Sequence, residues 1–489
     1  MTADTVLVID AGTSVMRAVR VRADGETAVV AREPWPAFTP QDAAPFGREL
    51  DAAAVESALG RLFTAAGPER DGLAAVAFTG QREGLVFLDG DGDAVCAGPN
   101  IDARASAEGM MIDAVHAAEV YATTGHLPSL MLAPAKLAWM RTSRADAAAR
   151  IERVMPLVDW LASSVAECCK MSRSLAAENG LLDIRHGAAA DGLLRALGMD
   201  AAVPEVIADG TISGEVHRGA LAGLPVVLCG ADTQCAILGA GAAEDGEAAV
   251  VAGWSAPLQL VTAKPVFDER RRTWTGVHVV PGRWLVESNA GDAGRAWDWL
   301  CGIMGMRADE ADALATAATP GARDAMAVLG PRAMNAAAMT AGVGALTVPL
   351  PLVMTAPDRG ELLRATLEAI AYAIRANLEQ VEEVWGGGLA RLGLGGGMSR
   401  SPLFVQILTD VIDRPVEVSF SRETSALGAA ALAAPALGLH ASLAEALDAM
   451  AGGRRTATPD AATSVAYEDY YERWCALCDA LQRLDAGDG

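Results

Sequence analysis

The chain has 489 residues, 52% of them hydrophobic, and a formal net charge of -23. So long a chain exceeds one hydrophobic core and predicts two large domains. The acidic balance argues against nucleic-acid binding, which requires a surface rich in Lys and Arg. The first residues lack the basic segment of a secretory signal, and no apolar run reaches the roughly 18 residues of a bilayer span. We therefore expect a soluble, cytoplasmic protein with a small-molecule partner and no nucleic-acid or membrane partner.

The N-terminal part combines apolar segments typical of strands with one helical segment. Strands are predicted at residues 5–9, 15–21, 27–31, 73–78 and 84–88. Residues 51–66 have the apolar spacing of a helix. The run at 5–9 is continuously apolar, which suits a strand buried on both faces. This order predicts an α/β domain that opens with a strand meander.

The rest of the chain repeats this combination. Strands are predicted at residues 224–229, 248–252, 274–280, 284–287 and 415–418, and helices at 361–384 and 403–413. Small and acidic residues at 239–246 interrupt both patterns, which is typical of a domain boundary. We therefore expect two related α/β domains, residues 1–240 and 241–489, that meet at a cleft.

The eight cysteines are thinly spread, unlike those of a secreted disulfide scaffold, so we expect reduced thiols. Cys475 and Cys478 have the spacing of a redox or zinc motif. Because no second pair and no histidine ligand lie nearby, the favoured interpretation is two small apolar residues on an amphipathic C-terminal helix.

Asp10 follows the first predicted strand, with Gly12, Thr13 and Ser14 in the next turn and Arg17 soon after. A carboxylate here can bind Mg²⁺, while hydroxyls, amides and the guanidinium can contact phosphate oxygens. The alternative is an ordinary Asp-x-Gly turn in a hairpin. The phosphate interpretation is favoured because other loops of the same kind accompany it.

An adjacent cation and anion, Arg82 and Glu83, interrupt two apolar strands. Such a pair can hydrogen-bond neighbouring hydroxyls of a sugar or polyol, with Arg donating and Glu accepting. The alternative is the solvated tip of a hairpin. The strongly apolar flanks favour a binding site. Asp102 and Lys136 are weaker candidates for supporting residues, since the first can be a helix cap and the second a solvated side chain.

Asp232 follows a predicted buried strand and precedes a segment where a helix can begin. A carboxylate fixed there can take the proton of a hydroxyl that attacks a γ-phosphate. An ordinary helix N-cap is the competing interpretation, and both can hold, because phosphate also binds at helix N-termini.

A run of three glycines, residues 395–397, follows another apolar segment. Glycines let backbone amides come close to a phosphate or a purine, because no Cβ blocks the approach. A single glycine run is weak support for a nucleotide site. Three such loops in one chain, each at a strand end, favour a nucleotide-binding protein.

These motifs resemble the FGGY family of carbohydrate kinases along nearly the whole chain. Residues 395–401, 414–416 and 423–430 are similar to the C-terminal signature of the family, in the same order. Residues 10–17 resemble its first phosphate motif, and residues 230–234 resemble the segment that holds its general base. Within the family, Arg82-Glu83 and the segment up to Arg104 look most like the autoinducer-2 kinases.

The resemblance implies two actin-like domains of the ribonuclease H type that flank a nucleotide cleft. It implies ATP and Mg²⁺ as cofactors and transfer of the γ-phosphate to a hydroxyl of a small sugar or polyol. By the same resemblance, Asp232 is the general base and Asp10 the metal ligand. The substrate-binding residues that it implies are Arg82, Glu83, Asp102 and Thr233. The ATP-binding residues that it implies are Gly12, Thr13, Ser14, Arg17, Gly253, Ser255, Gly294, Gly396, Gly397, Met398 and Ser401. The resemblance also allows a homodimer.

One loop departs from the family pattern. Where the family usually carries Gly-Thr in its second phosphate loop, this chain has Gly253-Trp254-Ser255. The hydroxyl that would contact the γ-phosphate is then displaced by one residue or absent. An alternative function is therefore a catalytically weakened sensor that binds nucleotide and sugar. A third hypothesis, an actin-like ATPase without a sugar acceptor, is disfavoured by the Arg82-Glu83 pair.

Overall fold

The computed structural model describes the chain except residues 1–2, 167, 339–341, 420, 451–452 and 486–489. The chain folds into two compact units. The first comprises residues 1–245, 261–285 and 423–452, and the second comprises residues 246–260, 286–422 and 453–489. Among the helices that the structure describes, none is both long and apolar enough to cross a membrane.

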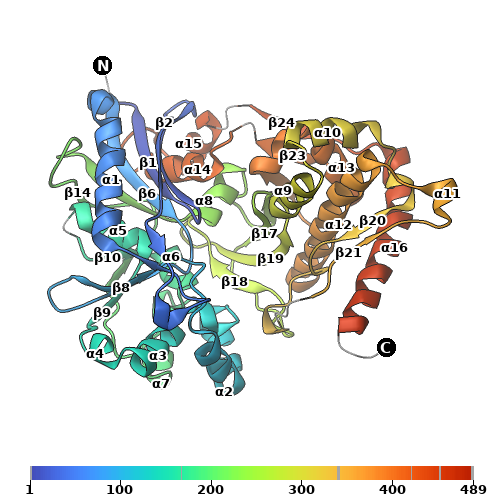
Figure 1. The fold of residues 1–489 in the computed structure, drawn as a ribbon. Helices are drawn as coiled ribbons and strands as arrows, with labels where there is room; N and C mark the ends of the chain where they lie inside the picture. Colours follow the sequence, from blue (N-terminus) through green and yellow to red (C-terminus); the bar gives the residue numbers. More distant parts are fainter. Residues whose placement is uncertain (1–2, 167, 339–341, 420, 451–452, 486–489) are drawn as a thin grey trace. The chain divides into compact units, whose positions relative to one another are not determined.

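A six-stranded mixed sheet forms the centre of the first unit (Figure 1). Its order is β14 (Thr211–Glu215), β15 (Pro225–Ala231), β6 (Leu73–Gly80), β1 (Thr5–Ala11), β2 (Val15–Arg22) and β3 (Thr27–Pro34). Strands β1, β2 and β3 form the predicted antiparallel meander, whereas β6 runs parallel to both β1 and β15. The carboxyl ends of β1, β6 and β15 therefore lie at one edge of the sheet.

Helices and small sheets complete the first unit. The helices are α1 (Ala52–Ala66), α2 (Ser106–Thr124), α3 (Ala133–Ser143), α4 (Ala145–Ala148), α5 (Leu157–Ala166), α6 (Arg173–Glu178), α7 (Asp191–Ala196), α8 (Asp232–Gly239), α14 (Thr424–Ala433) and α15 (Leu443–Met450). A three-stranded sheet contains β8 (Ala94–Gly98), β7 (Leu85–Leu88) and β9 (Arg153–Pro156). Three strand pairs are β4 (Ala37–Phe38) with β5 (Glu49–Leu50), β10 (Lys170–Ser172) with β13 (Glu205–Ile207), and β11 (Leu182–Asp183) with β12 (Ala188–Ala189). Helix α14 packs against α8, β1 and β6, so a late segment of the chain covers the earliest strands.

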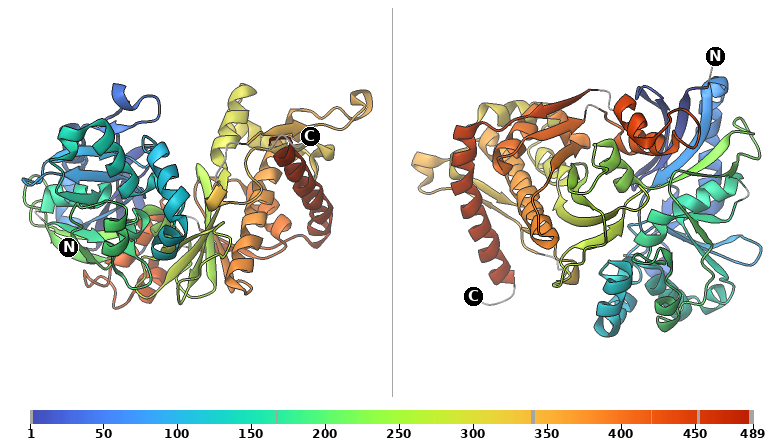
Figure 2. Two further views of the ribbon diagram at one scale, coloured as in Figure 1. Left: turned by 90° about the horizontal axis from the view of Figure 1, so that it is seen from below. Right: turned by 180° about the vertical axis from the view of Figure 1, so that it is seen from behind.

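A second sheet has the order β18 (Trp274–Val277), β19 (Trp284–Asp292), β17 (Ser255–Thr262), β16 (Glu247–Val251), β22 (Arg391–Gly395), β23 (Val416–Ser419) and β24 (Arg454–Ala457). The helices of the second unit are α9 (Gly294–Ile303), α10 (Ala308–Ala317), α11 (Leu352–Thr355), α12 (Arg359–Trp385), α13 (Pro402–Ile412) and α16 (Ala461–Asp485). Strands β20 (Met326–Val328) and β21 (Ala345–Thr347) form a separate pair. Helix α16 packs along α12 and α13 (Figures 1 and 2). The α/β class expected from the sequence is confirmed.

Most predicted elements are present with small shifts at their ends. The long helix predicted at 361–384 is α12, and Gly386 ends it in the left-handed conformation, at φ 79°. Strand β1 continues through Asp10 and Ala11, beyond the predicted end at residue 9, because its pairing with β2 and β6 continues there. Cys475 and Cys478 both lie on α16, and all eight cysteines are free thiols.

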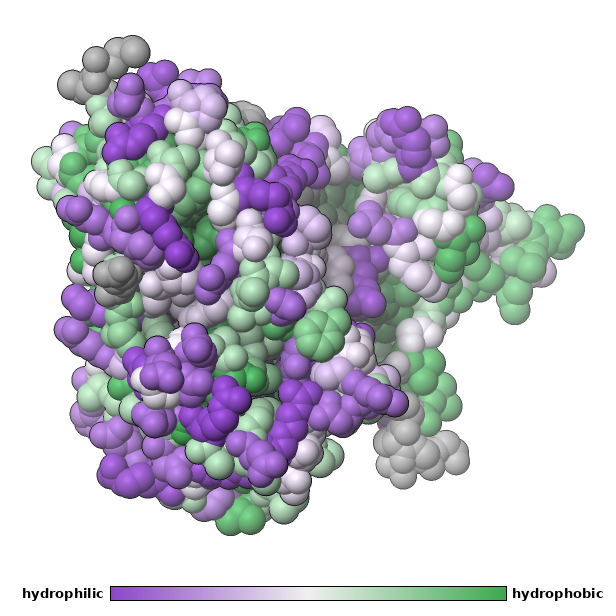
Figure 3. Space-filling model, turned by 60° about the vertical axis from the view of Figure 1, so that its left-hand side comes forward, coloured by the Kyte–Doolittle hydropathy of each residue, from purple (hydrophilic) through white to green (hydrophobic). Residues whose placement is uncertain are grey.

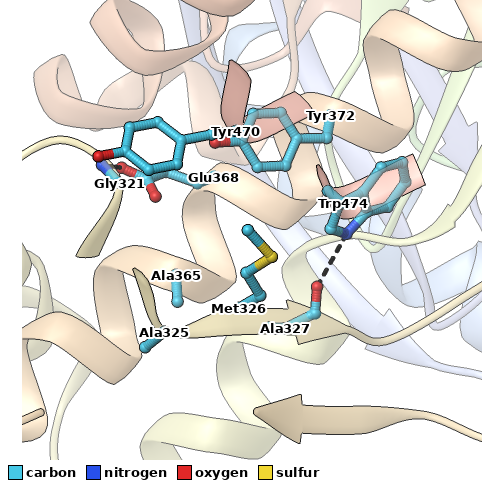
Figure 4. A pocket seen from close by; sticks show the side chains of 9 residues that line it. All are labelled: Gly321, Ala325, Met326, Ala327, Ala365, Glu368, Tyr372, Tyr470 and Trp474. Atoms are coloured by element: carbon cyan, nitrogen blue, oxygen red, sulfur yellow. Dashed lines mark hydrogen bonds between the residues drawn. The ribbon is translucent and has the colours of Figure 1, made fainter. Parts of the chain in front are cut away.

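Two features of the second unit lie apart from every predicted site residue. A small cavity between α12, α16 and β20 is lined by Tyr372, Tyr470, Trp474 and Glu368, among others (Figure 4). Exposed apolar side chains at Leu350, Leu352, Val353 and Met354 gather around α11, the projecting segment at the right of Figure 3.

Candidate active site

The register of the parallel strands places the first predicted loops next to each other in the first unit. Asp10 of β1 lies beside Thr79 of β6, and Gly80 of β6 lies beside Ala231 of β15. Asp232 follows Ala231 directly. The end of β1, the end of β6 and the start of α8 therefore meet at one edge of the sheet, as expected for parallel strands that precede functional loops.

Asp10 is 1% exposed and forms an ion pair with Arg17, its cross-strand neighbour on β2. Arg17 also forms an ion pair with Glu423, with 2.5 Å between Nη1 and Oε2. The guanidinium is thus held between two carboxylates, which keep the pKa of Arg17 above its usual value although burial opposes this. In the turn after β1, the Thr13 hydroxyl accepts a hydrogen bond from Asn100 Nδ2 at 2.9 Å.

Asp232 is the first residue of α8, and Ala231 is its N-cap, so the N-cap interpretation of Asp232 is wrong. The strand continues to Ala231 because β15 pairs with β6 up to that residue. Burial, together with the negative charge of Asp10, raises the pKa of Asp232 to about 6. Thr233 donates a hydrogen bond to Asp232 Oδ1 at 3.2 Å. A carboxylate with this pKa is poised to accept a proton near neutral pH.

Arg82 and Glu83 lie inside the protein, so the hairpin-tip interpretation is wrong. Glu83 is buried with φ 62°, and Arg82 Nη1 lies 3.3 Å from Glu178 Oε2. Burial raises the pKa of Glu83. Lys136, which the sequence also allowed as a solvated side chain, is buried, and its Nζ donates to the Glu83 carbonyl oxygen at 2.8 Å.

Asp102 is buried in a different ion-pair network. Its carboxylate accepts hydrogen bonds from Arg104 Nε at 2.9 Å and from the Arg48 amide at 3.0 Å. Arg104 also pairs with Glu49 and stacks on Trp139 at 4.9 Å. In this structure, Asp102 thus holds Arg104.

The second unit brings its predicted glycine loops together. The Gly294 amide donates to the Gly253 carbonyl oxygen at 2.9 Å, and the Met398 amide donates to the Ala252 carbonyl oxygen at 2.9 Å. A Cβ on Gly294 would lie 2.5 Å from the Gly253 oxygen, and a Cβ on Gly396 would lie 2.6 Å from the Ala252 oxygen. Gly396 also has φ 89°. These contacts require glycine at both positions. The backbone there carries no side chain, so a nucleotide could approach it closely.

The loop that departs from the family pattern, residues 253–255, carries an exposed aromatic side chain. Trp254 is 56% exposed, and the Arg295 guanidinium stacks over its ring at 4.7 Å. Ser255 is half-buried at the start of β17. Neither residue fills the core, so the substitution of the usual threonine is not explained by packing.

The last predicted loop is organised by helix capping. Ser401 is the N-cap of α13, accepts from the Phe404 amide at 3.0 Å and donates to Asp312 Oδ1 at 2.5 Å. Gly397 and Met398 lie in the short 3₁₀ turn before it. The Ser401 hydroxyl is therefore already engaged in this structure.

The first unit offers few ligands for a metal ion. Within the described part of the chain, no group of three or more His, Cys, Asp or Glu side chains is arranged to hold a metal. Mg²⁺ commonly binds one or two carboxylates together with substrate phosphates and water. The neighbouring carboxylates of Asp10 and Asp232 fit that requirement.

Sequence reasoning missed a buried cluster beside Arg82. Glu178 and His126 belong to it, and Gln234 joins it from α8. Neither Glu178 nor His126 stands in a recognisable motif, and the segments that carry them are far apart in sequence. Glu178 follows two alanines in a segment that matches no motif, so the sequence gave no signal of its role.

Comparison with known proteins finds relatives that match nearly the whole chain. Residues 5–239 match the N-terminal domain, and residues 248–437 the C-terminal domain, of the FGGY family of carbohydrate kinases. An autoinducer-2 kinase of Escherichia coli K12 is 28% identical, over 98% of this chain and 95% of the relative. The structure superposes on xylulose kinase from Rhodospirillum rubrum with a TM-score of 0.83 and 26% identity, over 98% and 99% of the two chains. It shares its fold with Plasmodium falciparum glycerol kinase, with a TM-score of 0.86 and 18% identity, over 98% of both chains. Because both family domains match and together cover most of its length, the chain belongs to the FGGY family of carbohydrate kinases.

Proposed function

We propose that this carbohydrate kinase moves the γ-phosphate of ATP to a hydroxyl of a small, linear sugar or polyol, with Asp232 as general base. The observation that supports this most is the position of Asp232, which follows a central parallel strand, lies close to Asp10 and has a pKa of about 6. An ionised carboxylate there can accept the hydroxyl proton as the oxygen attacks phosphorus.

The remaining predicted residues have roles that fit their surroundings. Gly12, Thr13, Ser14 and Arg17 would contact phosphate oxygens from the turn after β1. In the second unit, Gly253, Ser255 and Gly294 would lie along the phosphates, and residues 396–398 with Ser401 would border the adenosine. Mg²⁺ on Asp10 would neutralise phosphate charge. Arg82, Glu83, Asp102 and Thr233 would bind the acceptor and orient its hydroxyl, which supplies much of the rate in phosphoryl transfer.

The acceptor class follows from the relatives and from the site together. Relatives are named autoinducer-2 kinase, xylulose kinase and glycerol kinase. Arg82 and Glu83 together provide both donors and acceptors for vicinal hydroxyls. We propose a polyol, a ketose or the linear precursor of autoinducer-2 as the acceptor.

The test is ATP consumption by the purified protein with Mg²⁺ against three- to six-carbon polyols, ketoses, aldoses and the autoinducer-2 precursor. We expect one compound or one narrow class to stimulate turnover well above a control without acceptor. Rapid hydrolysis without any acceptor would instead identify an ATPase. ATP binding with no stimulation by any compound would contradict the proposed kinase activity.

Trp254 supports a second candidate, a nucleotide- and sugar-binding sensor with weak catalysis, because the loop lacks the usual threonine hydroxyl. Trp254→Thr restores that hydroxyl, and a hydrogen bond to a charged group contributes about 1.5 to 3 kcal/mol. We therefore expect kcat to rise at least about tenfold. The measurement is kcat with saturating ATP and the best acceptor, with Trp299→Thr, an exposed tryptophan on α9, as the matched control. An unchanged or lower kcat would remove the support that Trp254 gives to the sensor.

We further propose that the protein is cytoplasmic and forms a homodimer. The free state of all eight cysteines fits a reducing compartment. Exposed Met110, Met111 and Val115 on α2 offer an apolar face of the kind that a second copy can cover.

A further inference from the structure

Glu178 ends the short helix α6 and is buried, with 1% of its surface exposed. Its carboxylate has three partners. Oε2 lies 3.3 Å from Arg82 Nη1 and 3.3 Å from His126 Nε2, and Oε1 accepts a hydrogen bond from Gln234 Nε2 at 2.6 Å. Such a carboxylate is expensive to bury unless each oxygen is paired, as both are here.

The three partners come from three separate parts of the first unit. Arg82 lies between β6 and β7, where the acceptor is proposed to bind. Gln234 lies on α8, two residues after Asp232, and His126 follows the end of α2. One carboxylate thus connects the acceptor-binding segment to the helix that carries the general base.

An aromatic ring borders the same cluster. The Arg82 guanidinium lies 5.4 Å from the centre of the Trp274 ring, and the His126 ring lies 5.4 Å from it. Arg82 is therefore restricted both by an ion pair and by a ring face. Two such contacts leave a long arginine side chain little rotational freedom.

One polar atom in the cluster has no hydrogen-bond partner in the described part of the chain. Gln234 Nε2 is occupied by Glu178, whereas Gln234 Oε1 is buried and accepts no hydrogen bond from the residues that the structure describes. A buried acceptor without a donor is costly. A hydroxyl of a bound acceptor molecule would satisfy it.

The charges of the cluster support one another. Burial opposes ionisation of Glu178, yet Arg82 and His126 lower the pKa of Glu178 to about 2. Burial opposes protonation of His126, yet Glu178 raises the pKa of His126 above its usual value. Further charged groups near them are Glu83, Lys136 beside Glu83, and Asp232, whose pKa is raised by burial and lowered in part by the positive charge of Arg82.

We propose that Glu178 is a positioning residue for phosphoryl transfer, which fixes Arg82 toward the acceptor and orients Gln234 so that its free oxygen receives an acceptor hydroxyl. This inference rests on the proposed function. Glu178 acts through its partners and takes no part in the proton transfer itself. The arrangement fits a neutral acceptor with several hydroxyls, because the buried charges of the cluster are already paired within the protein.

The test is Glu178→Gln in the full-length protein, assayed with the acceptor that the wild type uses. A misplaced Arg82 should raise the KM for the acceptor on the order of 100-fold, because small displacements of an orienting group have effects of that size. The KM for ATP should change little. The pH dependence of the acceptor KM should change too, since His126 loses the carboxylate that favours its protonation. The acceptor KM of the variant should depend less on pH than that of the wild type between about pH 6 and 8, the range where histidine titrates.

Two further variants separate positioning from stability. Glu368→Gln removes a buried carboxylate that pairs with Arg364 at 2.8 Å in the second unit, next to the cavity of Figure 4. It should leave both KM values unchanged even if the protein unfolds at a lower temperature. His126→Asn keeps the Glu178 contacts to Arg82 and Gln234, so its acceptor KM should rise less than that of Glu178→Gln.

The positioning role would be overturned if the wild type is active and a folded Glu178→Gln variant has the same acceptor KM and pH profile as the wild type. That outcome would leave the proposed function intact. A wild type that phosphorylates no acceptor would instead contradict the proposed function. If Glu178→Gln does not fold, Glu178→Asp takes its place. The shorter carboxylate keeps the charge but loses the geometry, and a normal acceptor KM in it would also overturn the inference.

Discussion

Replacing Asp232 by Asn is expected to lower kcat by about 100-fold or more, because the amide cannot accept the proton of the attacking hydroxyl. Asn has nearly the same shape, so α8 should still begin at this residue and Thr233 can still donate to the side-chain oxygen. Binding of ATP and acceptor should therefore be retained. The comparison is kcat from steady-state assays beside dissociation constants from calorimetry.

The pH dependence gives a second measure of the same residue. The base works only when ionised, so wild-type kcat/KM should rise with pH and level off above a pH of about 6, the pKa of Asp232. This limb should be absent from the variant. Asp159→Asn is the matched control, because Asp159 is also buried and acidic, and among the described residues its carboxylate accepts hydrogen bonds from Ser172 alone. Its pKa of about 8 already keeps it protonated at neutral pH. Near-normal turnover of Asp232→Asn would refute the assignment of the base.

Replacing Gly396 by Ala is expected to weaken ATP binding by roughly 10- to 100-fold. Gly396 has φ 89° and ψ -179°, a region open almost only to glycine, where another residue is strained by about 1 to 3 kcal/mol. Its new Cβ would also lie 2.6 Å from the Ala252 oxygen. Ala252 cannot move away easily, since its amide donates to Gly395 at 3.0 Å and its oxygen accepts from Met398.

The measurement is the dissociation constant for ATP, with thermal unfolding as a check that the variant is folded. Gly388→Ala serves as the control, since Gly388 follows α12, has no atom within 4 Å of the added Cβ and belongs to another triple glycine. It should bind ATP normally. Normal ATP binding by a folded Gly396→Ala variant would show that this loop is not part of the nucleotide site.

The strands and the residues that follow them could be predicted because both signals are local. Apolar runs before Asp10 and Asp232 mark buried strands, and a parallel sheet brings the residues at such strand ends together. The apolar pattern places Asp10 beyond the strand, whereas it lies within the strand, because pairing with two neighbours prolongs β1. Sequence periodicity carries no information on such pairing.

The acceptor side of the site could be predicted only in part. The apolar flanks of Arg82 and Glu83 indicated burial, which the structure confirms for Glu83. The partners that determine the orientation of Arg82 come from α6 and from the end of α2, and no spacing rule connects those segments. The resemblance to the family supplied the roles of Gly294 and Ser401, whereas the helix-capping bond of Ser401 became visible only in three dimensions.

Helix α14, which begins just after the Arg17–Glu423 ion pair, covers strands that are made much earlier during synthesis. Residues of α14, which follows Glu423, are buried with Val6 and Val8 of β1, Ala75 of β6 and Cys229 of β15 in one hydrophobic core. During synthesis, therefore, the first strands leave the ribosome long before the helix that covers them. The emerging sheet keeps an apolar face open to water until about four hundred residues have been added after β1. The first unit is therefore completed only after most of the second unit has been translated.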